Sequence, residues 1–250
     1  MVYVQVEQGN FLLQKGNNQN TSERVIKFKR GSIYDKNGIP LAISITGFDL
    51  FALSGLSEDD FLKIKNTLKL NDLEYKSFNK KSLIKNSLSF EEMRKVRSLR
   101  IDRLELEKTY KRHYPLGEQV APLVGFSGRD GYGLEGLEKS YNSILTGKPL
   151  KERVLRDGAR STIQRLEVLE FGENSKDIYL TIDSNIQYIA YKYLVEAIKN
   201  NDGTGGTVII LDNSAKEVLA LASYPSYNPN NPMRSIKKNR AFLESYEPGS

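Results

Sequence analysis

Hydrophobic and polar residues alternate along the first part of the chain with the two-residue period of a β-strand. Valines alternate with polar neighbours over 1–7, a second alternating run covers 24–29, and leucines alternate with charged residues over 104–111. Successive side chains of a strand point to opposite faces, so all three runs predict strands. Between the first two, a polar loop is expected. The stretch 1–45 is therefore expected to be largely extended.

A tight turn is predicted where Asn37 precedes Gly38. Both residue types tolerate positive φ, and the pair stands between two short apolar runs. This pattern favours a β-hairpin. On local evidence it predicts structure and no chemistry.

The stretch 46–103 has sequence patterns that are typical of helices. Ser57 precedes an apolar pattern that ends at Leu68, and Ser89 with Glu92 forms a capping-box pattern. We therefore expect a small inserted helical lobe over 46–103. Its basic residues could bind an anion, but nearby carboxylates make a solvated face of mixed charge the favoured interpretation. The basic residues are Arg94, Lys95, Arg97, Arg100 and Arg103.

The run from Gly131 to Gly136 matches the spacing G-x-G-x-x-G of dinucleotide-binding loops. That motif needs a buried strand before it, whereas Pro122 and a turn-like segment stand there. The better interpretation is a turn that leads into one helix. Its apolar face is predicted to comprise Leu134, Leu137, Tyr141, Ile144 and Leu145, with an end at Gly147.

The last third of the chain predicts a second α+β unit. After a charged, strand-poor connector over 151–175, a strand is expected over 177–182, and Ser184 with Gln187 is expected to open a helix. Runs at 207–212 and 218–222 then predict a hairpin buried on both faces. The expected apolar face of the helix comprises Ile186, Ile189, Ala190, Tyr193, Leu194, Ala197 and Ile198. The fold class predicted for the whole chain is α+β.

The amino-acid composition excludes several kinds of functional site. Cysteine is absent, so disulfides and thiolate metal sites are excluded, and with one histidine, His113, a multi-histidine metal site is excluded as well. The net charge of +6 suits an anionic partner, although nucleic-acid binding rests on this charge alone. No apolar run approaches the roughly 18 residues needed to span a bilayer. We expect the chain to be soluble as given.

A serine follows a Pro-Gly turn in the final residues, Glu247-Pro248-Gly249-Ser250. A serine at the start of a helix faces unpaired backbone N–H groups and the positive end of the helix dipole. Such a position favours developing negative charge and suits a nucleophile. Pro-Gly-Ser is also an ordinary turn, so this pattern alone leaves both interpretations open.

Several short sequence motifs occur in the order found in class B penicillin-binding proteins. In these motifs the chain resembles that family, and most of all the division-specific peptidoglycan transpeptidase of Gram-negative bacteria. The membrane-proximal pedestal of that family is matched by 30–42, Tyr114-Pro115, Gly136-Leu137-Glu138-Lys139 and Leu145-Thr146-Gly147. The opening of its catalytic domain is matched by Leu180-Thr181-Ile182-Asp183, 220–223, 225–230 and Asn239-Arg240-Ala241. The resemblance extends over the whole chain.

This resemblance implies an elongated pedestal, or dimerisation-type domain, over 1–175, with the inserted lobe at 46–103. The start of a transpeptidase domain, truncated at the nucleophile, follows over 176–250. Ser250 then takes the role of the acyl-ester nucleophile, with no cofactor and no metal. The implied ligands are peptidoglycan stem peptides ending in D-Ala-D-Ala and β-lactams, and the implied partners are division proteins and a glycosyltransferase.

The resemblance also implies a periplasmic location on the bacterial inner membrane, through an N-terminal helix that this chain lacks. The sequence ends at Ser250, before the lysine of the family's Ser-x-x-Lys motif, so the chain itself is expected to be inactive. Internal matches at Ser77–Lys80, Ser82–Lys85 and Ser235–Lys238 do not occupy the family position. The alternative function is a non-catalytic scaffold of the division machinery. Nucleic acid is not expected as a partner.

Overall fold

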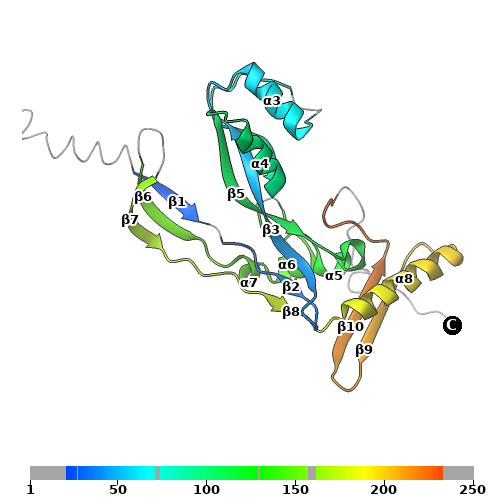
Figure 1. Cartoon of the computed structure of the whole chain (residues 1–250). Coiled ribbons are helices and arrows are strands. Elements are labelled where there is room, and N and C mark those ends of the chain that lie inside the picture. Colours follow the sequence, from blue (N-terminus) through cyan, green and yellow to red (C-terminus); the bar gives the residue numbers. More distant parts are fainter. Residues whose placement is uncertain (1–20, 27, 71–73, 129, 157–161, 233–250) are drawn as a thin grey trace, which may run out of the picture.

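The computed structural model describes residues 21–26, 28–70, 74–128, 130–156 and 162–232. The strand expected over 1–7 and the serine at 250 lie outside these ranges. Figure 1 shows an elongated molecule, with a small sheet at one end, a lobe projecting from its middle, and a helix with a hairpin at the other end. No helix among the described residues is long and apolar enough to cross a membrane.

The sheet at one end corrects the expectation of a strand-poor connector over 151–175. Strands β1 (Thr21–Ile26), β6 (Leu150–Arg156) and β7 (Thr162–Glu170) form an antiparallel sheet in the order β1-β6-β7. The many charges in this stretch do not prevent strand formation, because opposite charges face each other across it. Lys151 pairs with Glu170 at 2.6 Å and Arg153 with Glu167 at 2.9 Å, both in the β6–β7 register.

The central sheet is built on β3 (Pro40–Ala52), a strand of 13 residues. Strand β5 (Leu104–His113) pairs antiparallel along most of β3, and β4 (Ser82–Leu88) pairs with its far half. Strand β2 (Ile33–Tyr34) joins β3 through the turn at Gly38, whose φ is 80°, so the predicted hairpin is confirmed. Strand β8 (Ile178–Tyr179) pairs parallel with β2 and is shorter than the strand predicted there.

The inserted lobe contains the two predicted helices, α3 (Glu58–Leu68) and α4 (Phe90–Ser98), but it is not purely helical. Strand β4 lies between them and extends the sheet into the lobe. Both predicted caps are present: Ser57 accepts from the N–H of Asp60, and Ser89 with Glu92 forms a reciprocal capping box. The helices cover one apolar core, whose buried residues include Leu50, Phe61, Ile64, Leu88 and Val96.

The helix expected after the glycine-rich run is divided into α6 (Gly136–Ser140) and α7 (Asn142–Thr146). The break falls at Tyr141, and the Asn142 side chain accepts from the N–H of Gly133. Asparagine often bonds to nearby backbone in this way in preference to continuing a helix. Only part of the predicted apolar face is buried, because Leu145 is enclosed while Leu134, Tyr141 and Ile144 are exposed. Before these helices, η1 (Gly117–Gln119) and α5 (Ala121–Val124) form one compact turn.

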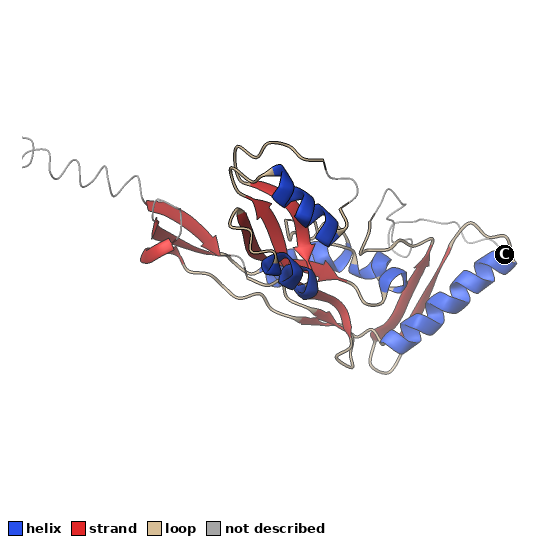
Figure 2. Ribbon diagram, turned by 45° about the horizontal axis from the view of Figure 1, so that its top comes forward, coloured by secondary structure: helices blue, strands red, loops and turns tan. Residues whose placement is uncertain are grey.

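At the far end, α8 (Ser184–Asn200) lies along one face of a hairpin made by β9 (Gly206–Asp212) and β10 (Glu217–Tyr224) (Figures 1 and 2). Helix and hairpin were both predicted. The helix begins at Ser184, as predicted, and its cap is Asp183, whose side chain accepts from the N–H groups of Asn185 and Ile186.

Fewer residues are buried at this end than the sequence pattern predicted. Ala190, Leu194 and Ile198 pack against Ala220 and Ala222 of β10. The prediction that the hairpin is buried on both faces was wrong, because α8 covers only one of them. Five residues predicted to be buried are exposed, namely Ile189, Tyr193, Ala197, Ile209 and Leu211.

Candidate functional site

The sequence motifs on which the family resemblance rests lie close together in the structure, where the central sheet contacts α8 and the β9–β10 hairpin. We call this region the junction and define it by Arg30, Asp35, Tyr114, Glu138, Gln187, Tyr227 and Asn230. These residues come from segments that lie far apart in the chain; Arg30 and Glu138, for example, are 108 positions apart. The tertiary structure thus brings dispersed phrases together at one place.

Glu138 is the centre of a buried ionic cluster. It is completely buried at the start of α6, and its two carboxylate oxygens face two arginines. Arg30 Nε donates to Oε2 at 2.6 Å, and Arg112 Nε donates to Oε1 at 2.7 Å. The guanidinium of Arg30 also donates to the carbonyl of Glu138 at 2.8 Å. A buried carboxylate flanked by two arginines in this way is stable only while both partners remain in place.

Arg30 and Arg112 each reach further groups and so connect several elements. Arg30 Nη1 lies 3.0 Å from the carbonyl of Gly131, 2.9 Å from Asn142 Oδ1 and 2.5 Å from Thr146 Oγ1. Arg112 Nη1 donates to the carbonyl of Gly31 at 2.7 Å. The cluster therefore fixes the start of the central sheet against α6 and α7.

Tyr114 links the ionic cluster to the segment after β10. Its hydroxyl lies 3.3 Å from Glu138 Oε1 and accepts from the N–H of Ser127 at 2.8 Å. Burial, together with the negative charge of Glu138, raises the pKa of Tyr114 to about 12, so the phenol stays neutral. The Asn230 side chain bonds both the N–H and the carbonyl of Tyr114, each at 2.9 Å.

Tyr227 and Ser226 attach the same segment to the helices beneath it. The hydroxyl of Tyr227 lies 3.1 Å from the carbonyl of Ala121 and 3.1 Å from Glu135 Oε2. Burial and the nearby Glu135 carboxylate raise the pKa of Tyr227. Ser226 Oγ donates to the carbonyl of Glu118 at 2.6 Å. The irregular segment 225–230 is thus held in place by side chains, as expected where proline limits regular backbone pairing.

Asp35 joins the predicted hairpin to the first turn of α8. Its Oδ1 accepts from the N–H groups of Asn37 and Ile39 at 2.8 and 2.7 Å, and its Oδ2 accepts from the N–H of Ser184 at 3.1 Å. Burial alone would raise the pKa of Asp35, but the hydrogen bonds from Ser184, Ile39 and Asn37 outweigh it and lower the pKa below its usual range.

The lowered pKa of Asp35 predicts a pH-dependent contribution to stability. When the folded-state pKa lies below the unfolded value, the carboxylate stabilises the protein above about pH 4 and loses this effect as the pH falls through the folded-state pKa. We expect Asp35→Asn to be less stable than the wild type at pH 7 and the difference to shrink by pH 3. Urea unfolding at pH 7, 5 and 3 measures this. The exposed Asp102→Asn serves as the control, and a difference for Asp35→Asn that stays constant with pH would contradict the prediction.

Gln187 is a junction residue whose role the sequence analysis missed, because it was interpreted only as part of the start of the helix. It is fully buried on α8. Its Nε2 donates to the carbonyls of Gln119 at 2.7 Å and Leu221 at 3.0 Å, and its Oε1 accepts from the N–H of Leu221 at 2.8 Å. An amide in line with the apolar residues Ala190 and Leu194 was the available signal for a buried polar bridge.

The junction is a positioning framework, since its polar groups bond mainly to one another; in the described part of the chain, Arg112 Nη2 is buried without a hydrogen-bond partner. Among the described residues, no group of histidine and carboxylate side chains is suited to a metal ion. His113 pairs through its backbone with Ile43 in the sheet. Of the internal Ser-x-x-Lys matches, Ser82 and Lys85 lie on β4, where Lys85 is paired with Glu92, and Ser235 lies outside the described ranges. Ser250, the predicted nucleophile, also lies outside them, so its role stays a prediction.

The structure has two parts. The first is an elongated α+β pedestal that contains the buried ionic cluster, and the second begins with α8 and the β9–β10 hairpin. This arrangement defines a two-domain protein. The family model described as "Penicillin-binding Protein dimerisation domain" matches residues 25–180, and the model described as "Penicillin binding protein transpeptidase domain" matches residues 206–250. The chain belongs to the class B penicillin-binding protein family. The predicted fold class is confirmed.

Curated relatives agree with this assignment. The chain is 35% identical over 269 residues to the probable peptidoglycan D,D-transpeptidase PenA of Neisseria gonorrhoeae, with 100% of the chain and 45% of PenA covered. It is 31% identical over 268 residues to the probable peptidoglycan D,D-transpeptidase PbpC of Pseudomonas aeruginosa, covering 46% of that protein. It is 29% identical to the peptidoglycan D,D-transpeptidase FtsI of Escherichia coli, covering 45% of it. The chain thus spans about half the length of the curated relatives it matches.

Solved structures share the fold. The structure of a peptidoglycan synthase complex, described as coordinating polymerization and crosslinking, matches with a TM-score of 0.66 and 25% identity, covering 91% of this chain and 43% of that one. The complex of penicillin-binding protein PBP2 with MreC from Helicobacter pylori matches with a TM-score of 0.63 and 22% identity, covering 84% and 44%.

Proposed function

We propose that this chain is the pedestal and the beginning of the catalytic domain of a serine D,D-transpeptidase that cross-links peptidoglycan. The observation that carries the proposal is the match of the transpeptidase family model to residues 206–250, a range that includes the Pro-Gly-Ser sequence. Supporting it, each curated relative described above is named as a peptidoglycan D,D-transpeptidase. The domain boundary that we propose lies between 175 and 176.

In the proposed reaction, the Ser250 hydroxyl attacks the carbonyl carbon of a terminal D-Ala-D-Ala bond. A lysine three residues further on, in the family's Ser-x-x-Lys motif, accepts the hydroxyl proton, and two backbone N–H groups stabilise the oxyanion. The terminal D-alanine leaves with a proton, and the amine of a second stem peptide then displaces the serine to form the cross-link. A β-lactam resembles the dipeptide and would leave a long-lived acyl-serine.

The finer assignment that we propose is septal cell-wall synthesis on the periplasmic face of the inner membrane. The similarity to FtsI supports this assignment. The proposed partners are division proteins and a glycosyltransferase; two structural neighbours are a complex of PBP2 with MreC and a peptidoglycan synthase complex. The proposed membrane attachment is a helix on the N-terminal side of the pedestal.

The alternative is a non-catalytic scaffold of the division machinery. The junction is compatible with it, because the same hydrogen bonds would give a rigid docking platform whether or not chemistry follows. Covalent labelling discriminates between the two functions, since a scaffold needs no reactive serine.

The test is acylation of the full-length protein by a fluorescent penicillin. We expect the wild type to be labelled and Ser250→Ala to lose all labelling, while Ser226→Ala, in the segment before it, keeps the label. Thermal unfolding of each variant shows whether loss of label reflects loss of fold. Full labelling of a folded Ser250→Ala variant would exclude Ser250 as the nucleophile, and absence of label on the folded wild type would favour the scaffold.

A further inference from the structure

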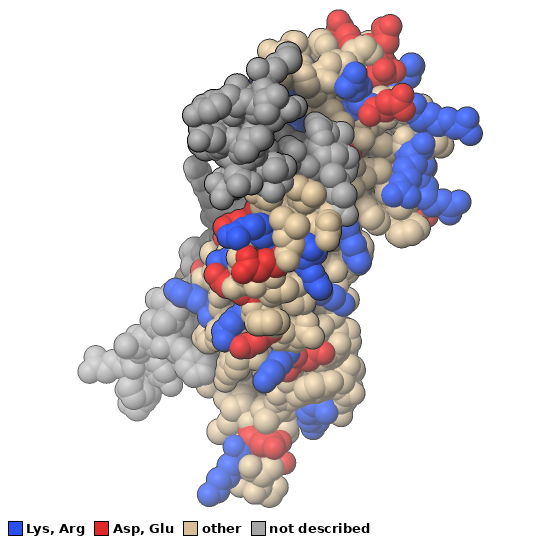
Figure 3. Space-filling model, turned by 90° about the vertical axis from the view of Figure 1, so that its left-hand side faces the viewer, with Lys and Arg blue, Asp and Glu red and all other residues tan. Residues whose placement is uncertain are grey.

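A cluster of unpaired cations lies on the lobe, away from the junction. We call Arg94, Lys95, Arg97, Arg100 and Arg103 the basic patch; they lie on α4 and on the turn from α4 to β5, and all five are exposed. None of their side chains forms an ion pair or hydrogen bond with any residue in the described part of the chain. Figure 3 shows the lobe at the top of the view, with Lys and Arg side chains gathered along its right-hand margin.

The carboxylates that could neutralise the basic patch are already paired with other lysines. Glu92 is bound by Lys85 of β4 at 2.7 Å. Glu105 and Glu107 of β5 are both bound by Lys81, at 2.9 and 2.5 Å. Unpaired carboxylates near the patch remain only at Glu91 and Asp102 among the described residues. The mixed-charge composition that favoured a solvated face therefore conceals a local surplus of positive charge.

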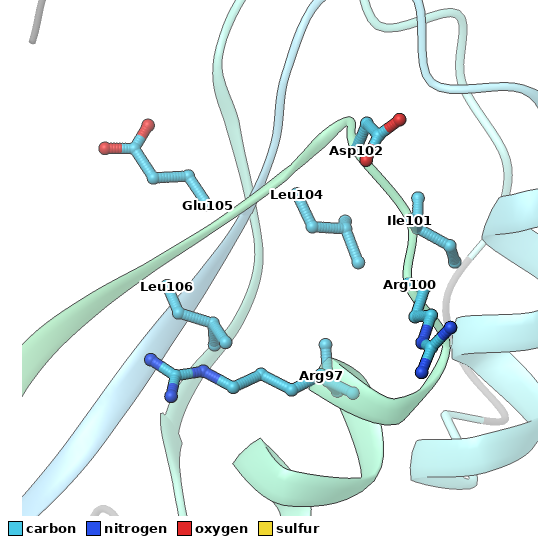
Figure 4. A pocket seen from close by; sticks show the side chains of 8 residues that line it. Arg97, Arg100, Ile101, Asp102, Leu104, Glu105 and Leu106 are labelled. Carbon is cyan, nitrogen blue, oxygen red and sulfur yellow. The ribbon is translucent and has the colours of Figure 1, made fainter.

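A hollow of about 380 Å³ lies between α4 and β5, inside the basic patch. Its apolar lining is Val96, Ile101, Leu104 and Leu106. In Figure 4, Leu104 and Leu106 point into this space, Arg97 and Arg100 border it, and the carboxylates of Asp102 and Glu105 point away from it. A second hollow of about 370 Å³, lined by Glu91, Arg94, Lys95 and Ser98, lies on another side of α4. The hollow between α4 and β5 thus combines an apolar recess with the unpaired guanidinium groups of Arg97 and Arg100.

We propose that the basic patch and its hollow dock an acidic segment of a partner protein. An apolar side chain of that segment fills the hollow between Leu104 and Leu106, and its carboxylates pair with Arg97 and Arg100. Arginine suits this role because its planar fork binds carboxylates through two parallel hydrogen bonds. The concave, apolar-lined shape favours a protein segment over an anionic membrane, because a bilayer surface takes up protruding apolar groups and cannot enter a recess.

The test uses the full-length protein and a fluorescent peptide in which glutamates flank leucines. We expect saturable binding that weakens as salt rises, since exposed charges are screened. Reversal of two charges by Arg97→Glu with Arg100→Glu should weaken binding about tenfold or more, because attraction becomes repulsion. The matched control is Lys192→Glu with Lys199→Glu on α8, which changes net charge equally on another exposed helix.

Three outcomes would overturn the proposal. Equal weakening by the control pair would show non-specific attraction to the positive chain. Equal binding of a polyglutamate peptide without leucines would remove the role of the hollow. Binding to phosphatidylglycerol vesicles that depends on Arg97 and Arg100, without binding of the peptide, would assign the patch to a membrane surface. Penicillin labelling at Ser250 is measured in parallel and should be unchanged by either pair, so the two proposals fail independently.

Discussion

Replacing Glu138 by alanine is expected to lower the free energy of unfolding by about 3–5 kcal/mol, the range found when one partner of a buried ion pair is removed. The variant leaves Arg30 and Arg112 charged, desolvated and without their shared carboxylate. Both guanidinium groups are almost fully buried, so water cannot take over the role of the carboxylate without opening the cluster. Urea unfolding followed by circular dichroism measures the change.

Glu173→Ala is the matched control. Glu173 pairs with Lys148 at 2.6 Å, as short as the contact between Arg30 and Glu138, but both side chains are about two-thirds exposed. Exposed pairs contribute roughly 0–1 kcal/mol, so the control should stay close to the wild type. If Glu138→Ala does not fold, Glu138→Gln keeps the volume and one acceptor, and the loss of stability should be smaller but still well above the control. Similar losses for Glu138→Gln and Glu173→Ala would show that the buried charge contributes little.

The second large effect is expected for Gly125→Ala. Gly125 ends α5 with φ 76° and ψ −154°, a conformation that is nearly restricted to glycine. An added Cβ would lie 1.9 Å from the carbonyl oxygen of Glu135 and 2.8 Å from the nitrogen of Gly136, both backbone atoms. Backbone strain and overpacking each cost roughly 1–3 kcal/mol, so a loss of about 3 kcal/mol or more is expected in urea unfolding.

Gly55→Ala separates the two causes of that loss. Gly55 also has a positive φ, 83°, but an added Cβ would have nothing within 4 Å. Its substitution should therefore cost only the backbone term, roughly 1–2 kcal/mol. Equal losses for the two variants would show that close approach of the backbone at Gly125 is unimportant.

The glycine-rich run shows how far sequence reasoning reached and where it stopped. The surrounding prolines and turns were enough to reject a dinucleotide loop. What the glycines do could not be predicted, because it depends on segments that meet only in three dimensions. Gly133 lets the carbonyl of Glu138 approach to 1.9 Å from where a Cβ would stand, and Gly136 packs against Gly125 and Leu123. Close approach to the chain itself, and not to a phosphate, accounts for these positions.

Local patterns predicted the caps of α3 and α4, the hairpin turn at Gly38 and the long helix α8, because each depends on neighbouring residues. Two of the errors share one cause, which is dependence on distant partners. Strands β6 and β7 were missed because their charges are neutralised across the sheet, as Lys151 and Glu170 show. Gln187 was misinterpreted because the groups it bonds, at Gln119 and Leu221, come from other parts of the chain. The motifs shared with the family include Glu138 and Tyr114, but they did not predict that these two side chains contact each other.

The parallel pairing of β2 with β8 has a consequence for how the chain acquires its structure. Ser32 and Asp177, whose hydrogen bond borders this pair, are 145 positions apart. Contacts of such long range are entropically costly to close and slow the folding of a domain. Strand β2 can therefore complete its pairing only when the chain through Tyr179 is available. We expect the lobe over 46–103, whose contacts are closer in sequence, to form before this pairing.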